Sequence, residues 1–188
     1  MKHTYTLLVA SAALASAALV AGCSDSGPGG GSGTLAFDYT GAASGHFNAS
    51  GAVPLFGQTD RSWALGLRDD TQGSFSIAAI QRSTSTTYHL VAFQMPRITP
   101  GSETVDINCS TSTCPTLAII FEIDDNTGDS GDICGLETGS LVLSTISESR
   151  ATGSFSGTGS CVSNSGTSTD FTVTNGSFSV PVRNASGF

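Results

Sequence analysis

Apolar and polar residues alternate with a period of two along most of this chain, and no convincing 3.6-residue helical period follows residue 34. The alternation is clearest in segments 75–79, 88–95 and 117–123, where every second residue is apolar apart from His89. Gly, Asn, Asp and Pro separate such segments. Because successive side chains of a strand point to opposite faces of a sheet, the pattern predicts β-strands. We expect an all-β protein.

Segment 34–188 carries roughly nine or ten such strands and is expected to form a single domain. Short turns between consecutive strands favour hairpins, so an antiparallel β-sandwich is the expected fold, with a small closed β-barrel as the alternative. Ala118 and Ile120 make segment 117–123 apolar on both faces, which indicates a strand buried on both sides. A repeated Gly-x-Phe pattern predicts inward-facing rings at Phe47, Phe155 and Phe178.

The first 22 residues have the features of an export signal. Lys2 gives a positive start, and segment 7–20 contains only Ala, Leu, Val and Ser. This apolar run is shorter than the roughly 20 residues of a membrane-spanning helix and has the length of a signal-peptide core. Segment 1–22 is therefore predicted to be a signal peptide that is removed from the mature protein.

The signal segment ends in Val20-Ala21-Gly22-Cys23, which resembles the lipobox of bacterial lipoproteins. The resemblance implies that the Cys23 thiol receives a diacylglycerol group, that cleavage precedes it, and that the new amino terminus is acylated, palmitate being a typical acyl group. Two or three acyl chains anchor a protein durably. Ser24 at the next position favours the outer membrane under enteric sorting rules. The closing run 172–182, TVTNGSFSVPV, also resembles uncharacterised β-sandwich domains of bacterial lipoproteins.

Residues 23–33 are predicted to form a flexible Gly- and Ser-rich linker between the lipid and the domain. After cleavage the expected mature chain contains six Arg, fifteen acidic residues and no lysine, so its net charge is −9. An acidic surface disfavours nucleic acid and anionic headgroups as partners. The expected partners are the membrane, through the anchor, and an envelope protein or glycan.

Four further cysteines are expected to form two disulfides in an exported chain, and three pairings are possible. The short loop 110–113 favours a local Cys109–Cys114 bridge, which leaves Cys134 with Cys161 around a predicted hairpin. A zinc site is disfavoured, because no second Cys or His lies at the short spacing of zinc ligands.

The acidic segment 124–132 is a candidate calcium loop with Asp125, Asp129 and Asp132 as ligands, since hard cations bind carboxylate and carbonyl oxygens. It lacks the Gly and Glu of an EF-hand, and a solvated turn between strands is the favoured alternative. No other cofactor is expected.

The same segment contains Gly-Asp-Ser-Gly at 128–131, which resembles the nucleophile loop of chymotrypsin-like proteases. It departs from that family at Asp132, and the family's Ala-Ala-His-Cys segment is absent. His46 is expected at the surface, and His89 falls on the apolar face of its strand, where a hydrogen-bonded core role is favoured. No catalytic residues are assigned, and we expect no enzyme.

Tyr39, Trp63 and Tyr88 could form an aromatic platform for a sugar, although a sandwich also needs large rings in its core. The leading hypothesis is a lipid-anchored envelope protein with a non-enzymatic binding or scaffolding domain. The alternatives are a calcium-assisted carbohydrate-binding module and, third, a hydrolase.

Overall fold

The computed structural model describes residues 31–41, 43–52, 61–95, 103–108 and 115–184, which form ten β-strands. Among these residues there is no helix long and apolar enough to span a membrane. The strands are β1 Ser32–Gly41, β2 Gly45–Ala52, β3 Trp63–Asp69, β4 Ser74–Arg82, β5 Thr87–Met95, β6 Glu103–Asn108, β7 Thr116–Asp124, β8 Ile133–Ile146, β9 Arg150–Val162 and β10 Ser168–Asn184. The all-β prediction is confirmed, and the count agrees with the expected nine or ten.

The sheet closes into a barrel of seven strands, in the order β3-β4-β5-β7-β8-β9-β10 and back to β3. All neighbours in this ring are antiparallel except β10 and β3, which pair in parallel through Val182–Gly66 and the two pairs that follow. The expected sandwich is therefore wrong, and the barrel alternative is correct.

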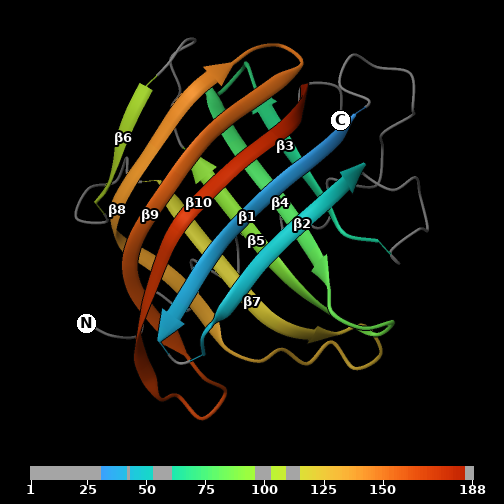
Figure 1. Cartoon of the computed structure of the whole chain (residues 1–188), viewed down its shortest axis with the longest axis vertical. Coiled ribbons are helices and arrows are strands. Elements are labelled where there is room, and N and C mark those ends of the chain that lie inside the picture. Colours follow the sequence, from blue (N-terminus) through green and yellow to red (C-terminus); the bar gives the residue numbers. More distant parts are fainter. Residues whose placement is uncertain (1–30, 42, 53–60, 96–102, 109–114, 185–188) are drawn as a thin grey trace.

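The physical reason lies in the length of β8, β9 and β10, which contain 14, 13 and 17 residues. Figure 1 shows them as long curved strands along one side of the molecule. Strands of this length can pair with different neighbours at their two ends, so the sheet bends round and meets itself. β10 pairs with β1 along Phe171–Ser179 and with β3 along Val182–Asn184.

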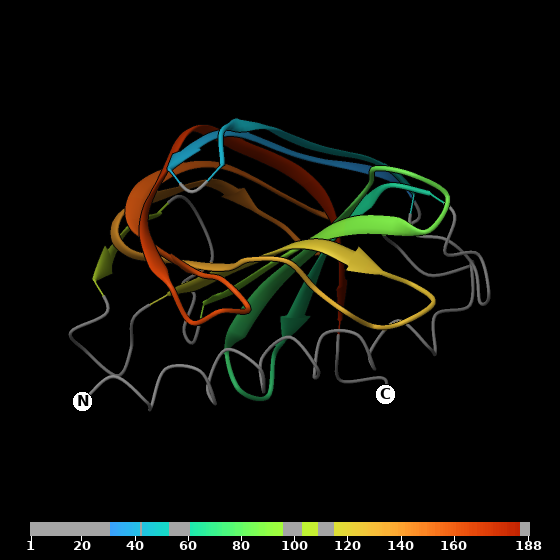
Figure 2. The same ribbon diagram turned by 90° about the horizontal axis from the view of Figure 1, so that it is seen from below.

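Three strands stand outside the ring. The β1–β2 hairpin extends from β10, and it lies on the opposite side of the core from β5 and β7 (Figure 2). β6 pairs with β8 along Thr138–Leu143, beyond the short stretch where β8 pairs with β7. The hairpin thus closes the core from a second side.

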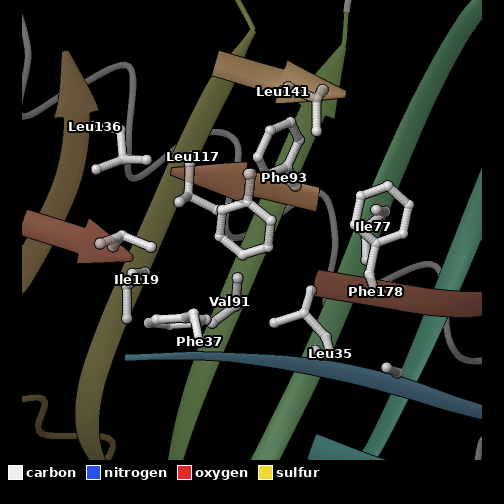
Figure 3. Packing of buried hydrophobic residues seen from close by; sticks show 14 of the residues in the cluster. Leu35, Phe37, Ile77, Val91, Phe93, Leu117, Ile119, Leu136, Leu141 and Phe178 are labelled. Atoms are coloured by element: carbon white, nitrogen blue, oxygen red, sulfur yellow. The ribbon is translucent and has the colours of Figure 1, made fainter. Parts of the chain in front are cut away.

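Aromatic and aliphatic side chains fill the space enclosed by these strands. Leu35 and Phe37 of β1 point towards Val91 of β5 and Ile119 of β7 (Figure 3). The rings of Phe37 and Phe47 stack at 5.0 Å between centroids. Among the described residues the core contains no buried polar or charged side chain. The three Gly-x-Phe rings are all buried, as expected from the sequence: Phe47 0%, Phe155 4% and Phe178 5% exposed.

The disulfide between Cys134 and Cys161 joins β8 to β9, where the two residues are direct cross-strand partners. This confirms the expected bridge around a hairpin. Cys109 and Cys114 lie outside the described residues, as do the signal segment 1–22 and Cys23, so these predictions stay untested.

β3 differs from the simplest interpretation of its sequence. Its large residues Trp63, Leu65 and Leu67 form a cluster separate from the core, while Ala64 belongs to the core. Gly66 also faces inward, because an added Cβ there would lie 2.8 Å from the Phe75 ring and 3.2 Å from Val180. The seam between β10 and β3 leaves room only for small side chains.

Candidate functional site

A depression of about 690 Å³ opens between the β4–β5 turn and the β7–β8 hairpin. Most of its lining residues carry a hydroxyl or a carboxylate group, and one carries an imidazole. The lining residues are Ser83, Thr84, Thr87, His89, Glu122, Asp124, Thr127, Asp129, Ser130 and Gly131. Both hairpins belong to the barrel wall, so the depression is built on paired strands and the turns between them.

A β-bulge in β7 shapes the floor of this depression. Tyr88 pairs with Ile123 and Leu90 pairs with Ile120, so Phe121 and Glu122 together face His89. Glu122 has a positive φ of 50°, which is uncommon for a residue with a side chain. The bulge leaves the main-chain N–H of Glu122 without a ladder partner on β5.

His89 supplies that partner. Its Nδ1 accepts the N–H of Glu122 at 3.0 Å, and its Nε2 lies 2.8 Å from the hydroxyl oxygen of Ser83. Because Nδ1 is an acceptor in the first bond, the ring proton of neutral His89 must sit on Nε2. Nε2 then donates to Ser83 Oγ. The His89 ring also contacts the Phe121 ring edge-on, with 5.4 Å between the ring centroids. This contact holds the imidazole on its core side.

Burial lowers the pKa of His89 below its usual value of 6.5, and the nearby charge of Glu122 raises it by a smaller amount. The neutral ring is therefore the form that the fold favours at neutral pH. The expected core role of this histidine is confirmed in part: it is half-buried and hydrogen-bonded, and it also lines a surface depression.

The Ser83–His89 pair has the atoms of a nucleophile and a base but the wrong proton arrangement. A general base needs a free lone pair on the nitrogen that faces the hydroxyl, with the other nitrogen donating to an orienting acceptor. Here the nitrogen facing Ser83 carries the proton, and a main-chain N–H occupies the other. The pair can bind a polar group, but it cannot draw the proton from Ser83.

The acidic loop at the rim is organised by its own hydrogen bonds. Asp124 Oδ1 accepts the N–H groups of Asn126 at 2.7 Å and Thr127 at 3.3 Å, which is the geometry of a turn. The carboxylate of Asp125 forms a salt bridge with Arg82, whose guanidinium also lies 5.0 Å from the centre of the Tyr88 ring.

The three candidate calcium ligands are not gathered into a cage. Across the described part of the chain, no three His, Cys, Asp or Glu side chains stand close enough together to hold a metal ion. Asp129 borders the depression, while Asp125 pairs with Arg82 and Asp132 contributes its carbonyl to the Phe121 N–H at 3.0 Å. The geometry lends no support to the calcium hypothesis, which only a titration would test.

A second polar cluster lies on β1, β2 and β10. Asp38 accepts hydrogen bonds from His46 and from Asn175, each at 2.8 Å. The bond from Asn175 and then that from His46 lower the pKa of Asp38. His46 and Asn175 are exposed and Asp38 is partly exposed, in agreement with the surface position expected for His46.

The three aromatic residues considered for a sugar platform lie in different surroundings. Tyr39 packs against Phe121 at 4.9 Å, next to the core, where burial raises the pKa of its hydroxyl. Tyr88 lies under Arg82, and Trp63 belongs to the cluster on the outside of β3. The structure does not bring them into one platform.

Ser83 and Glu122 are the site residues that sequence reasoning missed. Ser83 sits among Ser and Thr residues in a turn, and the bulge at Glu122 interrupts an alternation that reads as continuous. Ser130, from the protease-like run, does line the depression, but its carbonyl accepts a bond from Asn164 at 2.6 Å. Comparison with family models, curated proteins and solved structures finds no match to this chain.

Proposed function

We propose that this chain is a lipid-anchored protein of the bacterial cell envelope that binds a polar ligand, without chemistry, in the depression beside His89. One observation carries the choice of binding over catalysis: the Glu122 N–H at Nδ1 of His89 fixes the ring proton on Nε2. The site then offers hydrogen bonds to a ligand but no activated nucleophile.

The lining favours a ligand rich in hydrogen-bond donors. The carboxylates of Glu122, Asp124 and Asp129 only accept, and the surrounding Ser and Thr hydroxyls can both donate and accept. A hydroxyl-rich glycan matches these groups, because its hydroxyls can donate hydrogen bonds directly to the carboxylates. An open depression also admits one face of a longer chain more readily than it encloses a small molecule.

The anchor is proposed from the sequence. Lipid on Cys23 would hold the barrel at a membrane, with the outer membrane as the expected one, and residues 23–33 would let the depression face outward. Tethering confines the search for envelope ligands to a thin layer, so even a weak site is occupied when its ligand is part of the same layer.

A glycan array followed by calorimetric titration tests the binding function. We expect binding that Ser83→Ala and Glu122→Gln each weaken by about tenfold, the loss of roughly one buried polar contact. Ser156→Ala is the matched control, because this exposed serine lies on β9, away from the depression. Binding that none of the site variants changes would place the ligand elsewhere.

An assay of ester and peptide hydrolysis tests the alternative that the protein is a hydrolase. If the purified protein hydrolyses such substrates and His89→Ala abolishes the activity, the chain is a hydrolase and the binding proposal is wrong. Nitrogen NMR of His89 tests the same point directly, since a proton found on Nδ1 would contradict the arrangement that we assign.

A further inference from the structure

The imidazole of His89 is bonded on two sides to groups of other elements. The main-chain N–H of Glu122 on β7 donates to Nδ1 at 3.0 Å, and Ser83 Oγ in the β4–β5 turn lies 2.8 Å from Nε2. Because β5 stands between β4 and β7, the ring connects the bulge of β7 to the turn. Both bonds exist together only while the ring is neutral, since Nδ1 accepts with its lone pair.

A second proton on this ring can bind only at Nδ1. The new N–H would then face the N–H of Glu122, and two donors cannot form a hydrogen bond with each other. The cross-strand register passes from Tyr88–Ile123 to Leu90–Ile120, so Glu122 lies outside the regular ladder between β5 and β7. Protonation of His89 therefore breaks the bond that holds the bulge.

Glu122 is the residue whose conformation depends on this bond. Its φ of 50° is a conformation that a residue with a side chain keeps only where the surrounding structure holds it. Its side chain also lines the depression. Loss of the bond at Nδ1 therefore frees both the main chain of the bulge and a carboxylate of the binding site to move.

The charged groups that line the described depression are all carboxylates. Glu122 stands on the bulge, Asp124 at the end of β7 and Asp129 in the β7–β8 hairpin, while the β4–β5 turn contributes hydroxyls. Burial lowers the pKa of His89, and the charge of Glu122 raises it by less. An imidazolium at this position would be the cation of the lining, and the carboxylates attract it.

The other elements packed around the ring carry groups that are uncharged or already paired. On β4 the cross-strand partner of the histidine is Gln81, and the next residue, Arg82, forms a salt bridge with Asp125. On the core side the ring meets Phe121. Tyr39 of β1 packs behind Phe121, and burial raises the pKa of its hydroxyl, which stays neutral. A charged ring is therefore drawn towards the lining carboxylates.

We propose that His89 and the bulge form an acid-operated switch that controls ligand binding in the depression. At neutral pH the uncharged ring holds Glu122, and the lining carboxylates are available to the hydroxyls of a ligand. In acid the ring releases the Glu122 N–H and binds one of these carboxylates, so the imidazolium and the ligand compete for the same oxygens. The control of binding rests on the proposed function, whereas the release of Glu122 does not.

Nitrogen NMR of the labelled protein from about pH 7.5 to about 4 tests the switch without a ligand. We expect the ring to gain its proton at Nδ1, and the Glu122 amide to lose its protection from hydrogen exchange with the same midpoint. His46 is the internal control, because it is exposed and bonds to Asp38. A Glu122 amide that stays protected while His89 becomes charged overturns the inference, as does a His89 ring that is still neutral at the end of the titration.

Two variants assign the response to the right histidine. His89→Gln keeps an uncharged acceptor and donor but takes up no proton in this range, so its Glu122 amide should respond little to acid. His46→Gln is the matched control and should keep the wild-type response. Circular dichroism checks that both variants fold, and the wild-type titration stands independently of them. A wild-type response in His89→Gln would assign the switch to another group and overturn the inference.

A glycan array read at pH 7.5 and at one pH unit below the His89 midpoint tests the control of binding. At the lower pH only one molecule in about eleven has a neutral ring, so wild-type binding should be about tenfold weaker, while His89→Gln should change little. Equal wild-type binding at both pH values overturns the control of binding and leaves the proposed function intact. Binding of no glycan at either pH contradicts the proposed function, and the Glu122 amide still decides the switch.

Discussion

His89 stands opposite a two-residue bulge in β7 and accepts the main-chain N–H of Glu122 at 3.0 Å. The bulge and the histidine depend on each other, because the bulge frees an N–H and the imidazole satisfies it. The same bond decides which ring nitrogen carries the proton. A single hydrogen bond therefore links the local fold of the barrel wall to the chemistry available in the depression.

Replacing His89 should destabilise the barrel. His89→Ala leaves the Glu122 N–H without its partner, and losing one side of such a bond costs about 1–3 kcal/mol of the free energy of unfolding. Urea denaturation followed by circular dichroism measures it. His46→Ala is the control, since His46 is exposed and bonds only to an exposed carboxylate, and it should unfold like the wild type. Equal stability of His89→Ala and wild type would contradict the role of the bond.

Stability should fall as the pH is lowered through the range in which His89 titrates. Its pKa is lowered in the folded state, so the unfolded chain binds the proton more readily. The contribution is fully present above the unfolded value of 6.5 and is lost as the pH falls from there towards the lower folded pKa. Melting temperatures between about pH 7.5 and 5 measure it. The His89→Gln variant should lose this slope, and an unchanged slope would assign it to another group.

The Cys134–Cys161 disulfide should stabilise the hairpin between β8 and β9. It joins residues 27 apart in sequence, and closing a loop of that size contributes about 3–4 kcal/mol. The Cys134→Ser/Cys161→Ser double variant should lose that amount in a denaturant titration under oxidising conditions. Under reducing conditions the two proteins should differ little. Free thiols at these positions in the oxidised wild type, detected by alkylation, would contradict the bridge.

The seam between β10 and β3 should be sensitive to side-chain size. Gly66→Val places methyl groups where an added Cβ already approaches Phe75 and Val180, and overpacking of this kind costs about 1–3 kcal/mol. Gly135→Ala is the matched control, because its nearest contact is 3.6 Å away. Thermal unfolding of both variants measures the difference. A Gly66→Val protein as stable as Gly135→Ala would argue against a tightly closed seam.

Local structure was largely predictable from the sequence, because the two-residue period directly reports which side chains share a face. Val91, Phe93 and Met95 face the core together, as do Leu117 and Ile119. Period alone carries no information on what lies beyond each face. For β3 it therefore could not show that Ala64 and Gly66, rather than Trp63 and Leu65, would face the core.

Closure of the sheet and the site both arise from irregularities that a regular pattern hides. A barrel and a sandwich have the same alternation of apolar and polar residues. They differ in the pairing of their long strands, such as β10, which pairs with β1 along one part of its length and with β3 along another. The bulge at Glu122 shifts the register by one residue, which moves Ile123 out of the series begun by Leu117. Neither feature has a distinctive residue pattern, so the depression beside His89 could be found only in three dimensions.

The lipid on Cys23 is the central claim, because the proposed envelope location and the proposed tether both depend on it. Mass spectrometry of the mature protein, purified from bacterial membranes with detergent, tests it most directly. We predict an amino-terminal peptide that begins at Cys23 and carries the mass of a diacylglycerol group together with an N-acyl chain. A mature protein that begins at another residue, or at an unmodified Cys23, would contradict the account.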